Sequence, residues 1–327
     1  MIRRRLGRWL GWMAGIALAL TALTAQADSI RTACPPAPEP FSAEELQTAP
    51  FQDHGLLWRL DKDGRTSYLY ATIHVARREW ALPGPVVRAA LRSVDHAAFE
   101  LNLLDPDVLT RLQRAAQQPA GAARLPAEEA RQIEQAARHA CVQGSLDGLR
   151  PELQVVTLVS LALRGDGFDP AWGIDHWLMR QAKTQGLRLV SLETPEQQVS
   201  LMVHAQPAAV LAAVRQGLQE LQGDASRAVV RRLVEAWACS RVDELETFAQ
   251  WCACQETEAD RAQHRATVDA RNPAMADRIA ALHQRGHTVF AAVGALHMVG
   301  EAGLPQQMAR RGFTVGQVPL QLPLHRQ

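Results

Sequence analysis

Segments with the composition of β-strands lie near both ends of this 327-residue chain, and a long stretch with helical periodicity separates most of them. They are short and rich in β-formers, and they cover residues 56–60, 66–73, 95–101, 187–192, 287–293 and 313–318. Because strands are stable only when they pair, a sheet here has to be assembled from distant parts of the chain. We therefore predict an α/β (α+β) fold, with a central mixed sheet flanked by helices and a largely helical middle.

The amino terminus has the three parts of a secretory signal peptide. Four arginines and no acid precede an apolar stretch from Trp9 to Leu23. After it, Ala25-Gln26-Ala27 has the small-x-small pattern that signal peptidase accepts. The apolar stretch is shorter than the roughly 20 residues that span a bilayer. We therefore predict that residues 1–27 are a signal peptide cleaved near Ala27. The mature protein is then periplasmic or secreted, with no stable membrane span.

Residues 28–55 contain five prolines and predict a mostly irregular lead-in before a domain that extends from residue 56 to residue 327. The five cysteines favour disulfides in an oxidising compartment, and their odd number leaves one thiol over. Their spacing does not assign the pairs. Cys252-Ala253-Cys254 with the histidines downstream also resembles a Cys/His zinc site, but the spacing is too tight for a usual zinc knuckle and favours a disulfide.

The charge of the chain gives no indication of a nucleic-acid partner. Removing the four arginines of the signal from the 35 basic side chains leaves 31 against 34 acidic ones. Lysine occurs only at Lys62 and Lys183, and the arginines are scattered among acids instead of forming a basic stripe. We therefore predict no nucleic-acid binding, and nothing in the sequence indicates an oligomeric state.

One local pattern occurs twice. A strand leads into Ala71-Thr72-Ile73-His74 near the start and into Gly294-Ala295-Leu296-His297 near the end, and a helix and another strand follow each time. A small residue three positions before a histidine allows a tight turn that presents the imidazole at the edge of the sheet, where open α/β sheets bind ligands. We predict a pseudo-twofold pair of such units with the two histidines close together. Glu100, late in the strand after the first unit, completes a common set of divalent-metal ligands.

Several short motifs occur in order along the chain: Trp58, then Tyr68-Leu69-Tyr70-Ala71-Thr72-Ile73-His74-Val75, Phe99-Glu100-Leu101, Gly173-Ile174-Asp175, Leu192-Glu193-Thr194-Pro195-Glu196-Gln197, Arg271-Asn272 and Val289-Phe290-Ala291-Ala292-Val293-Gly294-Ala295-Leu296-His297-Met298-Val299-Gly300. With these motifs the sequence resembles the TraB/GumN family, which includes the TIKI-type metalloproteases. The resemblance extends from about residue 56 to the carboxyl terminus.

The resemblance implies a fold like that of the erythromycin-esterase and ChaN group. It also implies a site made of the two histidine motifs, a glutamate and an arginine, which correspond to His74, His297, Glu100 and Arg271. In the TIKI branch the activity is divalent-metal-dependent peptide cleavage, with manganese or cobalt as supporting ions. Bacterial relatives include a protein linked to the shutdown of peptide pheromone signalling and one encoded beside xanthan genes.

These observations predict an exported hydrolase, most specifically a peptidase, in which His74, His297 and Glu100 bind one manganese, cobalt or zinc ion. The ion would lower the pKa of a bound water and polarise the scissile carbonyl. Glu100 serves either as a ligand or as the general base for that water. The Arg271 guanidinium suits an oxyanion or a substrate carboxylate. Glu193, at a strand end, either supports the site from behind or belongs to the cap of the next helix.

One feature of the first histidine motif leaves a rival interpretation open. Ala71 stands where the family usually has glycine, and alanine costs about 1 kcal/mol or more if the backbone needs positive φ there. The rival is a non-catalytic protein that binds a peptide or a sugar, or an accessory of a polysaccharide machine. A serine esterase is not indicated, because the chain has no Gly-x-Ser-x-Gly motif. His96 shares a strand face with Glu100 and is interpreted as a neighbour without a role of its own.

Overall fold

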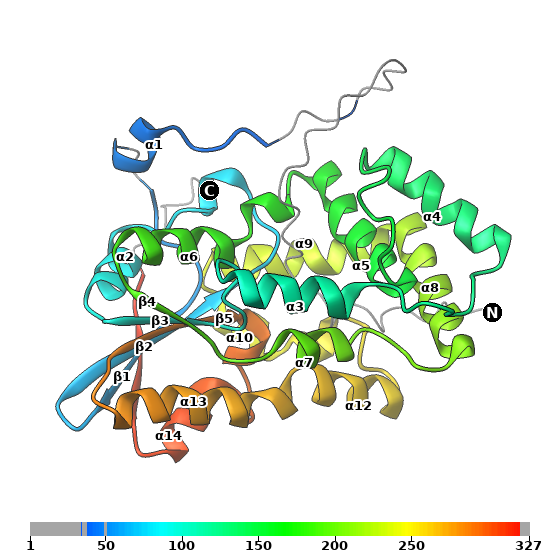
Figure 1. The fold of residues 1–327 in the computed structure, drawn as a ribbon. Coiled ribbons are helices and arrows are strands. Elements are labelled where there is room, and N and C mark those ends of the chain that lie inside the picture. The colour runs from blue at the N-terminus through cyan, green and yellow to red at the C-terminus, as the bar shows by residue number, and fades with distance from the viewer. Residues whose placement is uncertain (1–33, 35–37, 49–50, 321–327) are drawn as a thin grey trace.

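The computed structural model describes residue 34 and residues 38–48 and 51–320, so the predicted signal peptide lies outside the described residues. Its centre is a six-stranded sheet with the strand order β4-β3-β5-β2-β1-β6 (Figure 1). The strands are β1 (Leu57–Lys62), β2 (Arg65–Thr72), β3 (His96–Phe99), β4 (Arg188–Ser191), β5 (Val289–Gly294) and β6 (Thr314–Val318). The predicted sheet from distant chain segments is confirmed.

The pairing makes the sheet mixed. The pairs β2–β5, β5–β3 and β3–β4 are parallel, whereas β1 runs antiparallel to both of its neighbours, β2 and β6. The two histidine-bearing units begin with β2 and β5, which lie side by side in the middle of the sheet. Their second strands are not placed equivalently, because β3 pairs directly with β5 while β1 stands between β2 and β6. The two-fold relation therefore holds for the central pair of strands and breaks at β1.

The β1–β2 hairpin closes through Asp63 and Gly64, whose φ angles are 50° and 70°. Positive φ at both central residues is typical of the two-residue hairpin turn that matches the twist of the strands. The turn is tighter than the four-residue turn expected from Asp61-Lys62-Asp63-Gly64, because β1 continues to Lys62. Asp61 is drawn into the strand by its side-chain contacts with Arg59 and Thr66.

Helices cover both faces of the sheet and extend beyond one end of it (Figure 1). The helix α6 packs on β3 and β4 on one face, and α13 and α14 pack on β5 and β6 on the other. The helices are α1 (Ala43–Thr48), α2 (Pro85–Arg92), α3 (Pro106–Ala116), α4 (Ala127–His139), α5 (Pro151–Ala162), α6 (Ile174–Thr184), α7 (Pro195–Ser200), α8 (Pro207–Gln222), α9 (Asp224–Ala238), α10 (Val242–Glu246), α11 (Phe248–Trp251), α12 (Glu258–Thr267), α13 (Asn272–Gln284) and α14 (Leu304–Arg310).

The helical middle of the chain forms a layer of its own. Its helices α4, α5 and α8 pack on one another around the buried side chains of Ile133, Leu158 and Val214. The main core lies instead under the sheet, where every residue of β5 is buried. Strands that are buried on both faces read as continuous apolar runs, and Val289-Phe290-Ala291-Ala292-Val293 is such a run. The interior of the sheet around β5 is thus apolar, although the neighbouring strand β2 carries the buried polar side chains of Ser67 and Thr72.

The segment predicted as an irregular lead-in is tied to the domain where it is described. It contains the short helix α1, and Phe41 is buried against Trp172 and Trp177, with ring centroids 5.5 and 4.8 Å away. Further along, the fully buried Asp53 accepts hydrogen bonds of 3.0 Å from the backbone amides of Val86 and Val87. The lead-in therefore caps the start of α2.

The structure pairs Cys34 with Cys141 and Cys252 with Cys254, and Cys239 forms no disulfide. The first bridge joins the lead-in to the end of α4 across 107 residues. The second resolves the tight Cys252-Ala253-Cys254 spacing as a disulfide, as favoured over a zinc site. No described helix has the length together with the apolar character that crossing a bilayer requires.

Replacing Asp53 with alanine is expected to lower the free energy of unfolding by about 1–2 kcal/mol, because two amides in the first turn of α2 lose their acceptor. Urea unfolding measures the change. Asp147→Ala, at an exposed loop position, is the matched control and is expected to stay within about 0.5 kcal/mol of wild type. Equal stability of the two variants would show that Asp53 does not hold the lead-in.

Candidate functional site

The two motif histidines leave the sheet at the same edge. The strands β2 and β5 are parallel neighbours whose last residues, Thr72 and Gly294, lie opposite each other, and His74 and His297 follow two and three residues later. Glu100 comes directly after β3, on the other side of β5. This is the carboxyl edge of the parallel strands, where open α/β sheets bind ligands. Glu100 and His297 are buried, and the His74 side chain is 11% exposed.

Arg271 lies between α12 and α13. It is at the centre of a cluster that also contains Glu100, Glu193 and His297. Its Nη2 donates to Glu100 Oε2 at 2.6 Å and to Glu193 Oε2, and its Nε donates to Glu193 Oε1 at 2.9 Å. Its Nη1 donates to the backbone oxygen of Thr267 at 2.9 Å and lies 3.0 Å from His297 Nε2. A guanidinium has five N–H donors. All five are therefore used inside the protein.

Each glutamate of the cluster is held in a fixed orientation. Glu100 Oε1 accepts from the backbone amide of Gly294 at 3.0 Å, and Gln198 Nε2 reaches Glu100 at 3.0 Å and Glu193 at 3.1 Å. Burial raises the pKa of Glu100, although the neighbouring Arg271 and His74 lower it. Burial alone would lower the pKa of Arg271, but Glu100 and Glu193 outweigh it and raise that pKa above its ordinary value. The guanidinium is a permanent cation here.

The hydrogen bonds of His297 define which of its nitrogens carries the proton. Its Nδ1 lies 2.6 Å from Asn272 Oδ1, and the Asn272 amide nitrogen donates to the backbone oxygen of Ala302 at 2.9 Å. The amide oxygen therefore faces the ring, so Nδ1 donates and Nε2 accepts from Arg271. Burial lowers the pKa of His297 well below its ordinary value, and the nearby charge of Arg271 lowers it further. The imidazole is neutral, with its lone pair on Nε2.

His74 has a matching partner at Nδ1. Asp175 Oδ2 lies 2.7 Å from that nitrogen, and Thr72 donates to the other Asp175 oxygen through its hydroxyl. Asp175 can reach His74 because Gly173 packs directly against the backbone of His74. A Cβ on Gly173 would lie 2.8 Å from the carbonyl oxygen of His74. The Gly173-Ile174-Asp175 motif is thus explained by two contacts. Gly173 allows the close approach of the two backbones, and Asp175 orients the ring of His74.

The structure brings the predicted site residues to one edge of the sheet and adds three that the sequence did not single out. Glu193 is part of the cluster through Arg271, not merely a component of the α7 cap. The added residues are Asp175, Gln198 and Asn272. Two of them stand in the quoted motifs Gly173-Ile174-Asp175 and Arg271-Asn272, so position in a motif was the available signal. Nothing in the sequence marked Gln198.

Ala71 does not disturb this edge. It lies within β2 opposite Val293, is fully buried, and is not among the described non-glycine residues with positive φ. Gly294, which occupies the same position in the second motif, has a φ of −50°. Neither backbone position demands the left-handed region that only glycine adopts readily. The replacement of glycine by alanine therefore carries no conformational cost here.

The chemistry of the donors fits a divalent cation, with one competing contact. Two imidazoles that bind oxygen through Nδ1 and offer Nε2, beside a carboxylate, form a common ligand set. However, Arg271 Nη1 already contacts Nε2 of His297, and an ion there has to replace that contact. Among the described residues, the ligand atoms of three such side chains lie within 4.8 Å of one another at Asp95, His96 and His287, not at His74, Glu100 and His297.

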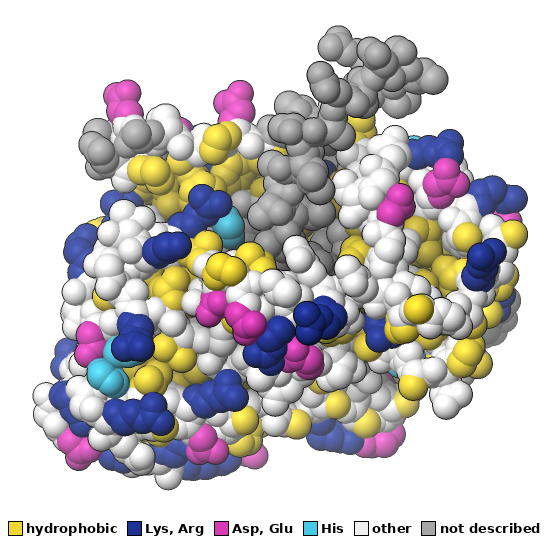
Figure 2. Space-filling view, viewed as in Figure 1, with side chains coloured by type: hydrophobic (Ala, Val, Ile, Leu, Met, Phe, Trp, Pro, Cys, Tyr) yellow, Lys and Arg dark blue, Asp and Glu magenta, His cyan; other side chains and the backbone are white. Residues whose placement is uncertain are grey.

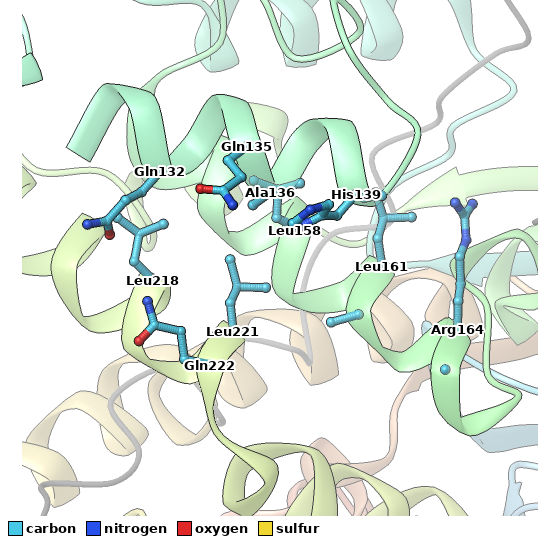
Figure 3. A pocket seen from close by; sticks show the side chains of 13 residues that line it. Gln132, Gln135, Ala136, His139, Leu158, Leu161, Arg164, Leu218, Leu221 and Gln222 are labelled. Carbon is cyan, nitrogen blue, oxygen red and sulfur yellow. The ribbon is translucent and has the colours of Figure 1, made fainter. Parts of the chain in front are cut away.

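A pocket of about 490 Å³ lies elsewhere, between α4, α5 and α8 in the helical layer (Figure 3). Leu158, Leu218 and Leu221 give it an apolar wall, and glutamines line its mouth together with His139 and Arg164. None of the predicted site residues lines this pocket. Because it lacks the convergent charged and hydrogen-bonded groups found at the sheet edge, we place the candidate site at the edge, not in the pocket.

The chain is similar to known proteins over most of its length. A model of the TraB/PrgY/gumN family matches residues 56–317. The uncharacterized protein YbaP of Shigella flexneri is 24% identical over 253 residues, which cover 75% of this chain and 88% of that protein. No solved structure matches significantly.

Replacing Arg271 with methionine would leave Glu100 and Glu193 buried without a counter-charge. We expect the free energy of unfolding at about pH 7 to fall by about 3–5 kcal/mol, as when a buried ion pair loses one partner. Burial holds the folded-state pKa of Glu100 above its unfolded value, so the protonated carboxyl favours the fold. Arg271 opposes this rise, so its removal raises the pKa of Glu100 further, and the loss should shrink as pH falls through the folded-state pKa of the variant. Urea unfolding at about pH 5 and about pH 7 measures it.

The control is Arg215→Met, which removes an exposed partner of Glu129 and is expected to cost at most about 1 kcal/mol. If Arg271→Met were as stable as this control at both pH values, the guanidinium would not be neutralising the two glutamates.

Proposed function

This chain belongs to the TraB/PrgY/gumN family, and from that premise we propose that it is an exported, divalent-metal-dependent hydrolase of peptides with its active site at the cluster around Arg271. The observation that carries the proposal is the matched environment of the two histidines, with His74 Nδ1 at Asp175 and His297 Nδ1 at Asn272. Metal-binding histidines commonly engage their second nitrogen with an oxygen in this way, which fixes the ring and raises its basicity.

In this proposal His74 and His297 hold the ion through Nε2, and Glu100 stands beside it either as a ligand or as the general base. The bound ion supplies Lewis acidity to the scissile carbonyl and acidity to a coordinated water. Burial favours Glu100 as a proton acceptor, because it brings the pKa of the carboxyl closer to neutral pH. Glu193 and Gln198 fix the orientation of the charged groups through their hydrogen bonds.

Arg271 is a positioning residue in this mechanism. All five of its N–H donors are used by Glu100, Glu193, Thr267 and His297, so none is left for an oxyanion or a substrate carboxylate. Its role is to pair with Glu100 and Glu193 in a buried place and to face the lone pair of His297. An ion that binds His297 would replace the contact between Arg271 Nη1 and His297 Nε2.

Export is supported from two sides. The basic, apolar and small-x-small segments of residues 1–27 have the order of a cleavable signal. The disulfides Cys34–Cys141 and Cys252–Cys254 suit an oxidising compartment such as the periplasm or the extracellular space. A hydrolase located there meets exported peptides, which suits the proposed substrate class.

The direct test is to purify the mature protein, remove metals, add manganese, cobalt or zinc, and assay cleavage of a peptide mixture by mass spectrometry. We expect metal-dependent cleavage that falls at least about a hundredfold in His74→Ala, because one ligand of the ion is lost. His139→Ala, on the exposed side of α4, is the matched control and should cleave like wild type. Cleavage that is absent, or identical in all three proteins, would remove the enzyme proposal.

Glu100→Gln separates the two roles of Glu100 because glutamine keeps the shape but is neither a charged ligand nor a base. If Glu100 is the base, we expect metal uptake to be unchanged and turnover to fall by about a hundredfold or more. If it is a ligand, affinity for the ion should fall by about tenfold or more as well. Metal titration and initial rates on the same preparation give the answer, and full activity in Glu100→Gln would exclude both roles.

A second candidate function is a non-catalytic binding protein, favoured by the saturation of Arg271. A cluster whose polar contacts are all satisfied within the protein is already stable without an ion. The two candidates predict different outcomes of the metal experiment. The binder keeps its affinity for a peptide in His74→Ala and takes up no ion at the cluster, whereas the hydrolase loses cleavage together with the ion.

A further inference from the structure

A second group of metal-binding side chains lies at the opposite edge of the same sheet. Asp95 and His96 stand at the beginning of β3, and His287 stands two residues before β5. Because β3 and β5 are parallel neighbours, with His96 opposite Val289, these residues meet at the amino ends of the strands. Glu100 and the Arg271 cluster lie at the carboxyl ends, so the two groups are separated by the length of β3.

The side-chain nitrogen and oxygen atoms of this group lie close to one another. His96 Nδ1 lies 2.8 Å from Asp95 Oδ1, and His287 Nδ1 lies 3.4 Å from Asp95 Oδ2. The two imidazole rings are tilted by 42° relative to each other, and their centroids are 4.2 Å apart. One ligand atom from each residue lies within 4.8 Å of the others. Ligands about 2.1 Å from a tetrahedral ion are themselves about 3.4 Å apart, so little movement is needed.

The backbone around the group is fixed by reciprocal hydrogen bonds. Thr288, the residue after His287, donates its amide to Asp95 Oδ1 at 2.9 Å, and its hydroxyl accepts from the Asp95 amide at 3.1 Å. The amide of His96 donates to the Thr288 carbonyl at 3.1 Å. The three candidate ligands are therefore held in register by backbone pairing, independently of any ion. Preorganisation of this kind lowers the cost of binding.

Exposure leaves room for an ion and its remaining water ligands. The Asp95 side chain is 52% exposed and that of His287 38%, whereas His96 is buried beneath them at 8%. Figure 2 shows histidine at the surface beside arginine or lysine on the left side of the molecule, over the sheet. Burial alone would raise the pKa of Asp95, but hydrogen bonds from His96 and Thr288 lower it, so the carboxylate is charged at neutral pH.

We propose that Asp95, His96 and His287 form a surface site for one divalent transition-metal ion, separate from the candidate active site. Two imidazoles and one carboxylate favour zinc, nickel or copper over magnesium or calcium, which prefer all-oxygen sites. The ion joins the start of β3 to the segment before β5, across 192 residues of sequence. It therefore stabilises the pairing of the two strands that carry the active-site edge.

The test uses untagged mature protein that carries His74→Ala, stripped with EDTA, so that neither a histidine tag nor the candidate active site contributes. Isothermal titration with Ni²⁺ or Zn²⁺ is expected to give one saturable site, with a rise in melting temperature that depends on ion concentration. Adding His287→Ala should weaken binding at least about tenfold and abolish that rise. Adding His139→Ala, an exposed histidine on α4, should change neither.

Asp95→Asn guards against a folding artefact, because asparagine keeps an acceptor for the Thr288 amide and removes the charge. We expect the same loss of affinity in a protein that still unfolds cooperatively without metal. Absence of saturable uptake in the His74→Ala protein, or equal affinity in its His287→Ala and His139→Ala derivatives, would overturn the site. Peptide cleavage plays no part in this readout, so the result does not depend on the proposed hydrolase.

Discussion

The buried guanidinium of Arg271 is the interaction on which the carboxyl edge of the sheet depends. It joins the residues that follow β3, β4 and β5, since Glu100, Glu193 and His297 all contact it, and it also binds the last turn of α12 through Thr267. Two carboxylates buried in an apolar surrounding need a partner of opposite charge, and Arg271 is that partner for both. The edge is thus assembled around one side chain whose every donor is used. Any ligand of His297 has to take part in that network or compete with it.

Such a network is costly compared with an apolar core of the same shape. Buried ion pairs are commonly neutral or unfavourable relative to well-packed hydrophobic residues, because desolvation offsets the attraction. The central strand β5 has the less costly arrangement, because it is wholly apolar and buried. The chain therefore keeps charge at a place where stability alone would not select it. Perturbed carboxyl and imidazole groups in a fixed array at the carboxyl edge of a sheet are a usual property of functional sites.

The sequence predicts this arrangement as far as local patterns extend. Alternation and β-formers locate the strands, and the repeated small-x-x-His motif places both histidines beyond the ends of neighbouring strands, as β2 and β5 confirm. The remaining features of the site depend on tertiary contacts between distant segments. Asp175 reaches His74 from 101 positions away only because Gly173 has no side chain, and the saturation of Arg271 depends on four residues from separate segments. A spacing rule cannot foresee either, because both depend on which segments fold against each other. The hairpin shows the same limit at short range, since Asp61 contacts Arg59 on its own strand and Thr66 on β2, and β1 continues past the expected turn.

The placement of charge follows from the sheet itself. The central strand β5 is apolar and wholly buried, so the charged side chains lie beyond the ends of the parallel strands and not along it. The carboxyl ends collect Glu100, Glu193 and His297, which are buried and locked by Arg271. The amino ends collect Asp95, His96 and His287, which are partly open to solvent and contain no cationic side chain among the three. The same residue types thus meet in two settings that differ in what neutralises the carboxylates. At the closed edge a guanidinium already supplies the positive charge, and at the open edge that place is left to the imidazoles or to an ion from solution. An ion at the carboxyl edge would therefore have to compete with Arg271, whereas an ion at the amino edge would meet no cationic side chain among the three proposed ligands.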